Sequence, residues 1–165
     1  MQKTVNLYPS VGLPGQEVAA HTAVYTPLNY LSDGTAAAGK FVFEGTAAAG
    51  KFVFEGTSDK KGVAFPVASA KGTTLVGLVE RTFTAAVPCG VDGSEAYPNG
   101  AELTIAVRGD FYVEAADEAT VGQAVLCDPA DGAVSYGTVG SGNDTGWVVV
   151  TAAKAKGDII IISRR

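Results

Sequence analysis

The sequence predicts an all-β fold, a small β-sandwich or barrel of short, mostly antiparallel strands with an extended N-terminal arm. Two observations favour it. Val, Thr, Ala and Gly are plentiful, whereas Lys, Glu and Leu, which favour helices, are sparse. Beyond residue 62, short apolar runs alternate with turn signals such as Asn99-Gly100 and Asp131-Gly132. The 165 residues can bury one continuous core, so we expect a single domain in all.

Residues 1–33 are predicted to form the arm. Three prolines fix φ and remove backbone donors there: Pro9, Pro14 and Pro27. The stretch Val11–Gly15 is therefore expected to be irregular. Four apolar side chains in the arm show no regular period: Leu7, Tyr8, Val11 and Leu13. Two interpretations stay open, because such an arm can pack on its own domain or lie across a partner.

Residues 34–61 contain an 11-residue unit that occurs twice without change, as Gly34–Glu44 and Gly45–Glu55, followed by a connector. Each copy ends in a strand-like Phe-Val-Phe run after a soft Ala/Gly segment. Because a strand has period two and eleven is odd, one continuous strand through both copies would change faces between them. We therefore expect one copy to belong to the fold and the other to be an insertion.

Residues 62–165 are predicted to form the core of the β-domain. The expected strands are Val63–Val67, Thr74–Arg81, Thr82–Val87, Glu102–Arg108, Asp110–Ala115, Gln123–Cys127, Ala133–Tyr136, Gly146–Thr151 and Asp158–Ser163. The one segment that favours a helical turn is Ala115–Thr120, which Gly122 soon ends.

Two motifs in the chain have the outline of functional sequences. Gly34-x-x-x-x-Gly39-Lys40 is similar to a phosphate-binding loop, but Phe41 stands where a hydroxyl must reach Mg²⁺ and a strand follows instead of a helix. The same outline recurs from Gly45 to Lys51, and we interpret both segments as flexible connectors. Arg108-Gly109-Asp110 spells an integrin-recognition tripeptide, yet it lies between two strand-like runs. A tight turn with Gly109 at its tip is the preferred interpretation.

The residues that carry chemistry do not form a catalytic or metal-binding pattern. His21 is the single histidine, and Cys89 and Cys127 lie too far apart for metal-ligand spacing. Asp110 and Glu114 share one face of a strand, but an exposed acidic face accounts for them. We predict no enzymatic activity, no metal and no cofactor.

The charge of the chain limits its partners. The net charge is -5 and the pI is about 4.8, so phosphate backbones are repelled and no nucleic-acid partner is expected. The apolar run Ile159–Ile162 is too short to cross a bilayer, and the first residues lack the apolar stretch of a signal peptide, so we expect no membrane association.

The order of several short motifs resembles the tailed-phage capsid decoration proteins, also called structural cement proteins. The motifs are Gly-Leu-Pro-Gly in the arm, Lys40-Phe-Val-Phe43, Leu75–Val79, Ala106–Ala115, Gly122–Asp128, Asp131–Val134 and Gly157–Ile162. The similarity covers most of the chain and includes no catalytic signature. The duplicated unit departs from the family pattern, which has one copy.

The resemblance implies a structural protein that binds the outer surface of an icosahedral bacteriophage capsid and stabilises contacts between major capsid protein subunits. Its partners would be the major capsid protein and further copies of itself, with a homotrimer favoured over a homodimer. It would be made in the cytoplasm of the bacterial host and end on the virion. The arm would then supply the capsid-interface residues Leu7, Tyr8, Val11, Leu13 and Pro14.

A second function class stays open on sequence alone, a receptor- or carbohydrate-binding β-module of a phage tail or virion. It predicts exposed aromatic side chains on one face, with Tyr97 and Tyr136 as candidates. Trp147 begins the apolar run that ends at Val150, and we expect it to pack in the core instead.

Overall fold

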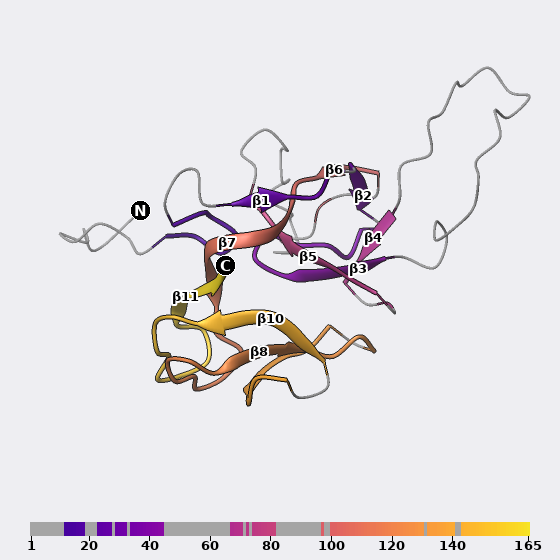
Figure 1. Cartoon of the computed structure of the whole chain (residues 1–165). Helices are drawn as coiled ribbons and strands as arrows, with labels where there is room; N and C mark the ends of the chain where they lie inside the picture. The colour runs from indigo at the N-terminus through magenta and orange to yellow at the C-terminus, as the bar shows by residue number, and fades with distance from the viewer. Residues whose placement is uncertain are drawn as a thin grey trace, which may run out of the picture.

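The computed structural model describes residues 12–18, 23–27, 29–32, 34–44, 67–70, 72, 74–81, 97, 100–130, 132–140 and 143–165 (Figure 1). The all-β prediction is confirmed, because these residues form eleven strands and no helix. None of them forms a helix that could span a membrane. The strands are β1 Val24–Tyr25, β2 Tyr30–Ser32, β3 Phe41–Glu44, β4 Val67–Ser69, β5 Leu75–Val79, β6 Glu102–Leu103, β7 Ile105–Glu114, β8 Ala124–Cys127, β9 Val134–Gly137, β10 Asp144–Val149 and β11 Ile159–Arg164.

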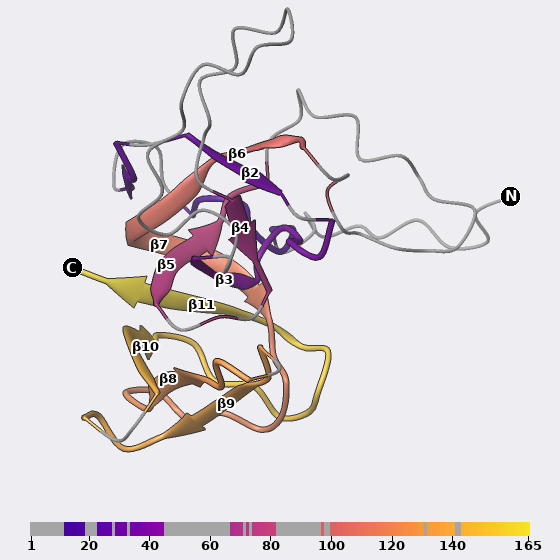
Figure 2. The ribbon, with the colours of Figure 1, turned by 90° about the vertical axis from the view of Figure 1, so that its right-hand side faces the viewer.

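The strands form one curved sheet of half-barrel shape in the order β6-β2-β4-β3-β5-β7-β11-β10-β8-β9, with β1 paired to β7 outside this path. β2 and β4 run parallel, and the other pairings among the described strands are antiparallel. The ten-residue β7 joins the two parts of the sheet, since it lies between the β1–β6 part and the β8–β11 part (Figures 1 and 2).

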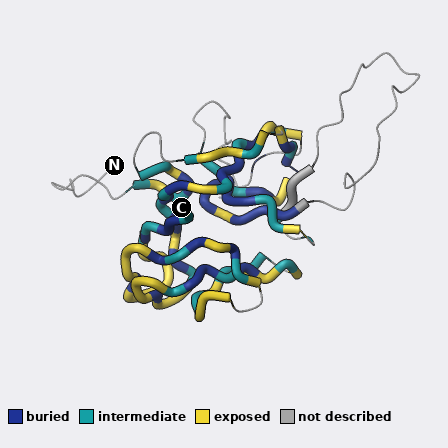
Figure 3. Tube along the Cα trace, in the orientation of Figure 1, coloured by how far each residue is buried: buried dark blue, intermediate teal, exposed yellow. Residues whose placement is uncertain are grey.

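Two apolar cores lie on opposite faces of the central strands. The larger core contains Trp147, which is fully buried and makes edge-to-face contacts with Phe41 and Phe111 at ring-centroid distances of 6.3 and 5.9 Å. The smaller core contains Val42 and Val79. Strands buried on both faces read as continuous apolar runs. This explains the Phe-Val-Phe sequence of β3, because Phe41, Val42 and Phe43 are all buried. Figure 3 shows buried residues along the middle of the strands.

Most of the predicted strands of the core domain are confirmed, among them β5, β8, β9, β10 and β11. Thr82–Val87 and residues 63–66 lie outside the described residues. Two short strands, β1 and β2, lie within the arm region, where the prolines predicted irregular structure. Each has only two or three residues, so a hydrophobic period could not reveal it.

The predicted turn at Arg108-Gly109-Asp110 is wrong. All three residues lie inside β7, which continues unbroken from Ile105 to Glu114. Gly109 has φ of 129°, and a Cβ built on it would lie 2.8 Å from the Cα of Ala23. The glycine is needed because the arm crosses β7 at this residue, and not because the chain reverses there.

The predicted helical turn at Ala115–Thr120 is also wrong. Ala119 forms an isolated antiparallel bridge with Ala153, and the Ala115 N–H donates to the Asp158 carbonyl at 2.8 Å. Six residues cannot repay the cost of helix nucleation. Their backbone groups are satisfied by tertiary pairing instead.

The interpretation of Gly34–Lys40 as a flexible connector is wrong for this first copy of the repeated unit. Ala36 and Ala38 are buried at 0% and 3% exposure. The Gly39 N–H donates to the Val79 carbonyl at 2.9 Å, and the backbone of Gly39 lies against Gly15. Small residues are used here because the segment packs closely against the arm. The second copy, Gly45–Glu55, lies outside the described residues.

Deleting residues 45–55 is expected to leave the melting temperature within about 3 °C of the full chain. The first copy already supplies β3, and halving the connection between β3 and β4 changes the loop-closure entropy by only about 0.6 kcal/mol. Differential scanning calorimetry of the two proteins measures this. A loss of more than about 10 °C would show that both copies contribute to the fold.

Substituting Gly109→Ala is expected to lower the free energy of unfolding by about 3 kcal/mol, because the new Cβ meets the crossing chain and the positive φ is strained. Gly122→Ala is the matched control, since Gly122 also has a positive φ, of 88°, but open space around it. It is expected to cost about 1 kcal/mol. Urea unfolding compares the two variants, and equal losses would exclude the close approach as the reason for Gly109.

Candidate functional site

The first described residues of the arm form a tight turn from Leu13 to Gln16. Pro14 and Gly15 occupy its two central positions, and Gly15 has φ of 81°, as the second central residue of a type II turn requires. The Gln16 N–H donates to the Leu13 carbonyl at 2.9 Å, and the Leu13 N–H donates to Gln16 Oε1 at 3.1 Å. The Gly-Leu-Pro-Gly motif of the sequence is therefore a defined turn.

Backbone hydrogen bonds tie this turn to β7. The Gly15 N–H donates to the Tyr112 carbonyl at 2.8 Å, and the Tyr112 N–H donates to the Gln16 carbonyl at 2.9 Å. The Val18 N–H donates to the Asp110 carbonyl at 2.9 Å. The Arg81 N–H, just after β5, donates to the Gly15 carbonyl at 2.8 Å. Residues 15–18 therefore pair with β7 at the point where β5 ends.

Beyond residue 18 the arm crosses β7 and forms β1, in which Val24 pairs with Arg108 and Tyr25 with Ala106. Glu17 stabilises this crossing, because its Oε1 accepts the Ala23 N–H at 2.9 Å. Arg81 adds a side-chain bond from Nε to the Pro14 carbonyl at 2.8 Å. The described arm is thus hydrogen-bonded to β7 both before and after Gly109.

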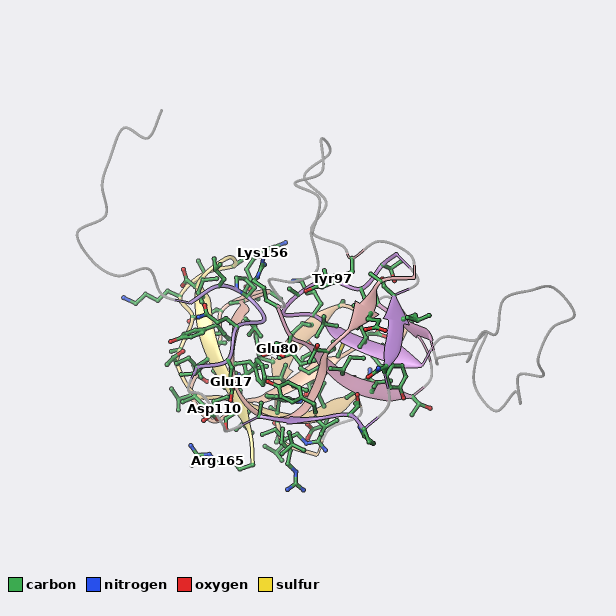
Figure 4. All side chains as sticks on the ribbon, turned by 90° about the horizontal axis from the view of Figure 1, so that it is seen from above. Glu17, Glu80, Tyr97, Asp110, Lys156 and Arg165 are labelled. Atoms are coloured by element: carbon green, nitrogen blue, oxygen red, sulfur yellow. The ribbon has the colours of Figure 1, made fainter. Side chains whose placement is uncertain are left out.

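A small acidic cluster lies beneath β1. The Tyr25 hydroxyl donates to Glu80 Oε1 at 3.0 Å, and Glu17 and Glu80 are close enough to interact electrostatically (Figure 4). Burial raises the pKa of Glu80, and the charge of Glu17 raises it further, while the bond from Tyr25 lowers it. Burial and the carboxylate acceptor raise the pKa of Tyr25 far above its usual range. The hydrogen bond from the Tyr25 hydroxyl ties β1 to Glu80, whereas burial and the charge of Glu17 disfavour the ionised form of Glu80.

The predicted contact residues fall into two groups. Leu7, Tyr8 and Val11 lie outside the described residues. Leu13 is 48% exposed at the turn, and Pro14 is partly buried with its carbonyl bound to Arg81. Of the exposed large apolar side chains among the described residues, three belong to the arm: Leu13, Val24 and Tyr25. The arm therefore presents apolar side chains outward on a backbone that is fixed to the domain.

The aromatic residues do not form an exposed platform in the described part of the chain. Tyr97 is 1% exposed, and its hydroxyl donates to the Glu80 carbonyl at 3.2 Å. Tyr136 packs against the larger core, and burial raises its pKa. Trp147 lies in the core, as predicted. The aromatic candidates for glycan binding are thus used for packing.

The acidic pair Asp110 and Glu114 forms no joint site. Asp110 lies opposite Ser163 in the β7–β11 ladder and 3.8 Å from the exposed Arg165, whereas Glu114 faces solvent opposite Ile159. Among the described residues no group of three or more His, Cys, Asp or Glu side chains could hold a metal ion. Cys127 is buried, and its thiol donates to the Gly132 carbonyl at 3.6 Å. His21 and Cys89 lie outside the described residues.

The comparison with protein families decides between the two function classes. All of the chain, residues 1–165, matches the family described as structural cement protein (E217 gp24/Pam3 gp6). The chain belongs to the structural cement protein family. A search of the curated proteins finds no match. The family membership confirms the resemblance seen in the motif order, and with it the structural role of decorating and cementing a phage capsid.

In this cement protein the residues that anchor the arm were not identified from sequence. No sequence motif includes Glu17, while Arg81 and Tyr112 fall within expected strands and carry no sign of contact with the arm. The sequence carries a signal at Gly12, which follows Val11, and at Gly109, a glycine inside a strand-like run. A Cβ at Gly12 would lie 2.2 Å from the ring of Tyr112, so the chain must pass directly over that ring.

The acidic cluster predicts a pH dependence of stability. Because the pKa of Glu80 is raised on folding, its contribution to stability is present in full below its ordinary value of 4.5 and is lost as the pH rises through the folded value. The wild-type cement protein should therefore gain stability relative to Glu80→Gln as the pH is lowered from 7.5 to 4.5. Glutamine keeps the acceptor for Tyr25 and removes the charge.

Urea unfolding of both proteins across this pH range measures the difference. In a Glu17→Gln background the difference should change less with pH, because burial still raises the pKa of Glu80 but the added effect of the Glu17 charge is gone. A difference in the free energy of unfolding that stays constant from pH 4.5 to pH 7.5 would contradict the assignment.

Proposed function

We propose that this cement protein binds the outer surface of an icosahedral phage shell at joints between major capsid protein subunits. The observation that carries the proposal is the arm, whose apolar side chains Leu13 and Val24 are about half exposed on a backbone held by β7. Large apolar side chains on a fixed backbone lose little conformational entropy when a partner covers them. The segment that includes Leu7, Tyr8, Val11 and Pro14 is the proposed first contact with the shell.

Binding of this kind stabilises the shell by mass action. A protein that binds the assembled shell and not the separated subunits shifts the equilibrium toward the shell. It needs to bury surface across a joint, and it needs neither an active site nor a cofactor. The proposed role is structural and not catalytic. The proposed place of synthesis is the cytoplasm of the bacterial host.

Self-association is the second part of the proposal. A closed oligomer on a shell must match the local symmetry, so a homotrimer at threefold positions is favoured and a homodimer at twofold positions is the alternative. The low fraction of charged residues, 18% against about 25% in ordinary domains, suits a protein with several contact surfaces.

Removal of residues 1–11, combined with Leu13→Asp, is expected to weaken binding to undecorated expanded shells by at least tenfold. The melting temperature of the free protein should fall by less than about 3 °C, because the bonds of residues 15–18 to β7 remain. Cosedimentation with shells and calorimetry of the free protein measure the two effects. Val139→Asp, at an exposed site away from the arm, is the matched control.

Two outcomes would contradict the proposal. Full-length protein that does not bind the shells would exclude the surface role. If the truncated variant lost as much free energy of unfolding as free energy of binding, the arm would serve to pack against its own domain.

A further inference from the structure

The place that β3 occupies between β4 and β5, here called the β3 position, is filled by a segment that the chain carries twice. Gly34–Glu44 fills it in the structure. Gly45–Glu55 has the same residue at each of the eleven positions, and the two residues that follow each copy, Gly and Thr, are the same as well. No side chain within the unit distinguishes the copies.

The β3 position makes strict demands on its occupant. Phe41 must reach Trp147 in the larger core, where the ring centroids lie 6.3 Å apart. Val42, with no exposed surface, must fill the smaller core on the other face. Ahead of the strand, position 39 must be a glycine, because its φ is 73° and a Cβ there would lie 2.7 Å from the backbone nitrogen of Gly15.

The second copy meets each of these demands with the same residue type. Phe52 corresponds to Phe41, Val53 to Val42 and Gly50 to Gly39. The backbone bonds of the first copy include Val79 N–H to the Lys40 carbonyl at 2.9 Å and Tyr97 N–H to the Ala36 carbonyl at 2.7 Å. They need only the backbone and the same local conformation, so the second copy can make them too.

The connections on either side are what differ between the copies. With the first copy in place, β2 leads into the unit directly, and the Gly34 N–H donates to Ser32 Oγ at 3.0 Å. With the second copy in place, eleven residues would move from the connection after β3 to the connection before it. The entropy of loop closure changes slowly with length, so this rearrangement is a small obstacle beside the loss of a central strand.

We propose that the β3 position is a binding site for the repeated segment and that the two copies are interchangeable occupants of it. The first copy fills the site in the intact chain because its connection to β2 is short. The second copy fills it when the first is damaged. This inference rests on the fold alone and is independent of the proposed contact with a capsid.

Single and double substitutions at matched positions test the proposal. Asp in place of Val42 would bury a carboxylate in the smaller core, which excludes that copy from the β3 position. Val42→Asp alone is expected to lower the melting temperature by only a few degrees, because the second copy replaces the first. Val53→Asp alone is expected to leave it unchanged. The double variant Val42→Asp/Val53→Asp is expected to lose at least about 10 °C or fail to fold.

Hydrogen exchange with mass spectrometry gives a second measurement that stability alone cannot imitate. In Val42→Asp, slow exchange should move from residues 41–44 to residues 52–55. A chain that lacks residues 45–55 is the control, because it has no second copy to replace the first. In that chain, Val42→Asp should lower the melting temperature as much as the double variant does in the full chain.

Three results would overturn the proposal. Val42→Asp could be as severe as the double variant, so that nothing replaces the first copy. Val53→Asp could be severe by itself, so that the copies have separate structural roles. The double variant could be as stable as the wild type, in which case the β3 position does not depend on the repeated segment.

Discussion

The fold depends on β7, because one strand is shared by both parts of the sheet and by the arm. β5 pairs with its first residues, β11 pairs with the residues from Gly109 onward, and the arm lies along it on either side of the crossing at Gly109. A strand used by this many neighbours must satisfy each of them at once. Gly109 makes this possible, since it has no side chain where the arm passes over.

This arrangement gives the arm two different properties. Its backbone belongs to the domain, through the bonds of Gly15 and Gln16 to Tyr112. Two of its apolar side chains lie at the surface, since Leu13 and Val24 are about half exposed. The two sequence-based interpretations, packing on the domain and contact with a partner, are therefore compatible. The turn at Pro14 fixes the place at which the exposed Leu13 leaves the domain.

The sequence was sufficient for the strands that have a clear period and turn signals, such as β8, β9 and β11. It was insufficient where tertiary contacts outweigh local preference. Arg108-Gly109-Asp110 has the composition of a turn, and only the crossing of the arm explains why it is strand. Ala115–Thr120 has the composition of a helix, but its backbone pairs with the segment that follows β10. The family was predictable because the order of motifs survives such local errors, whereas the anchors Glu17 and Arg81 carry no signal without the fold.

The pairing of β1 and of residues 15–18 with β7 also has a consequence for the order of events during synthesis. These pairs join residues near the N-terminus to residues from Ala106 to Tyr112, so the arm has no partner strand until most of the chain has left the ribosome. Contacts between distant residues also slow folding, because a long loop must close before they form. The newly made chain therefore carries the arm without its partner strand until those residues of β7 have been made.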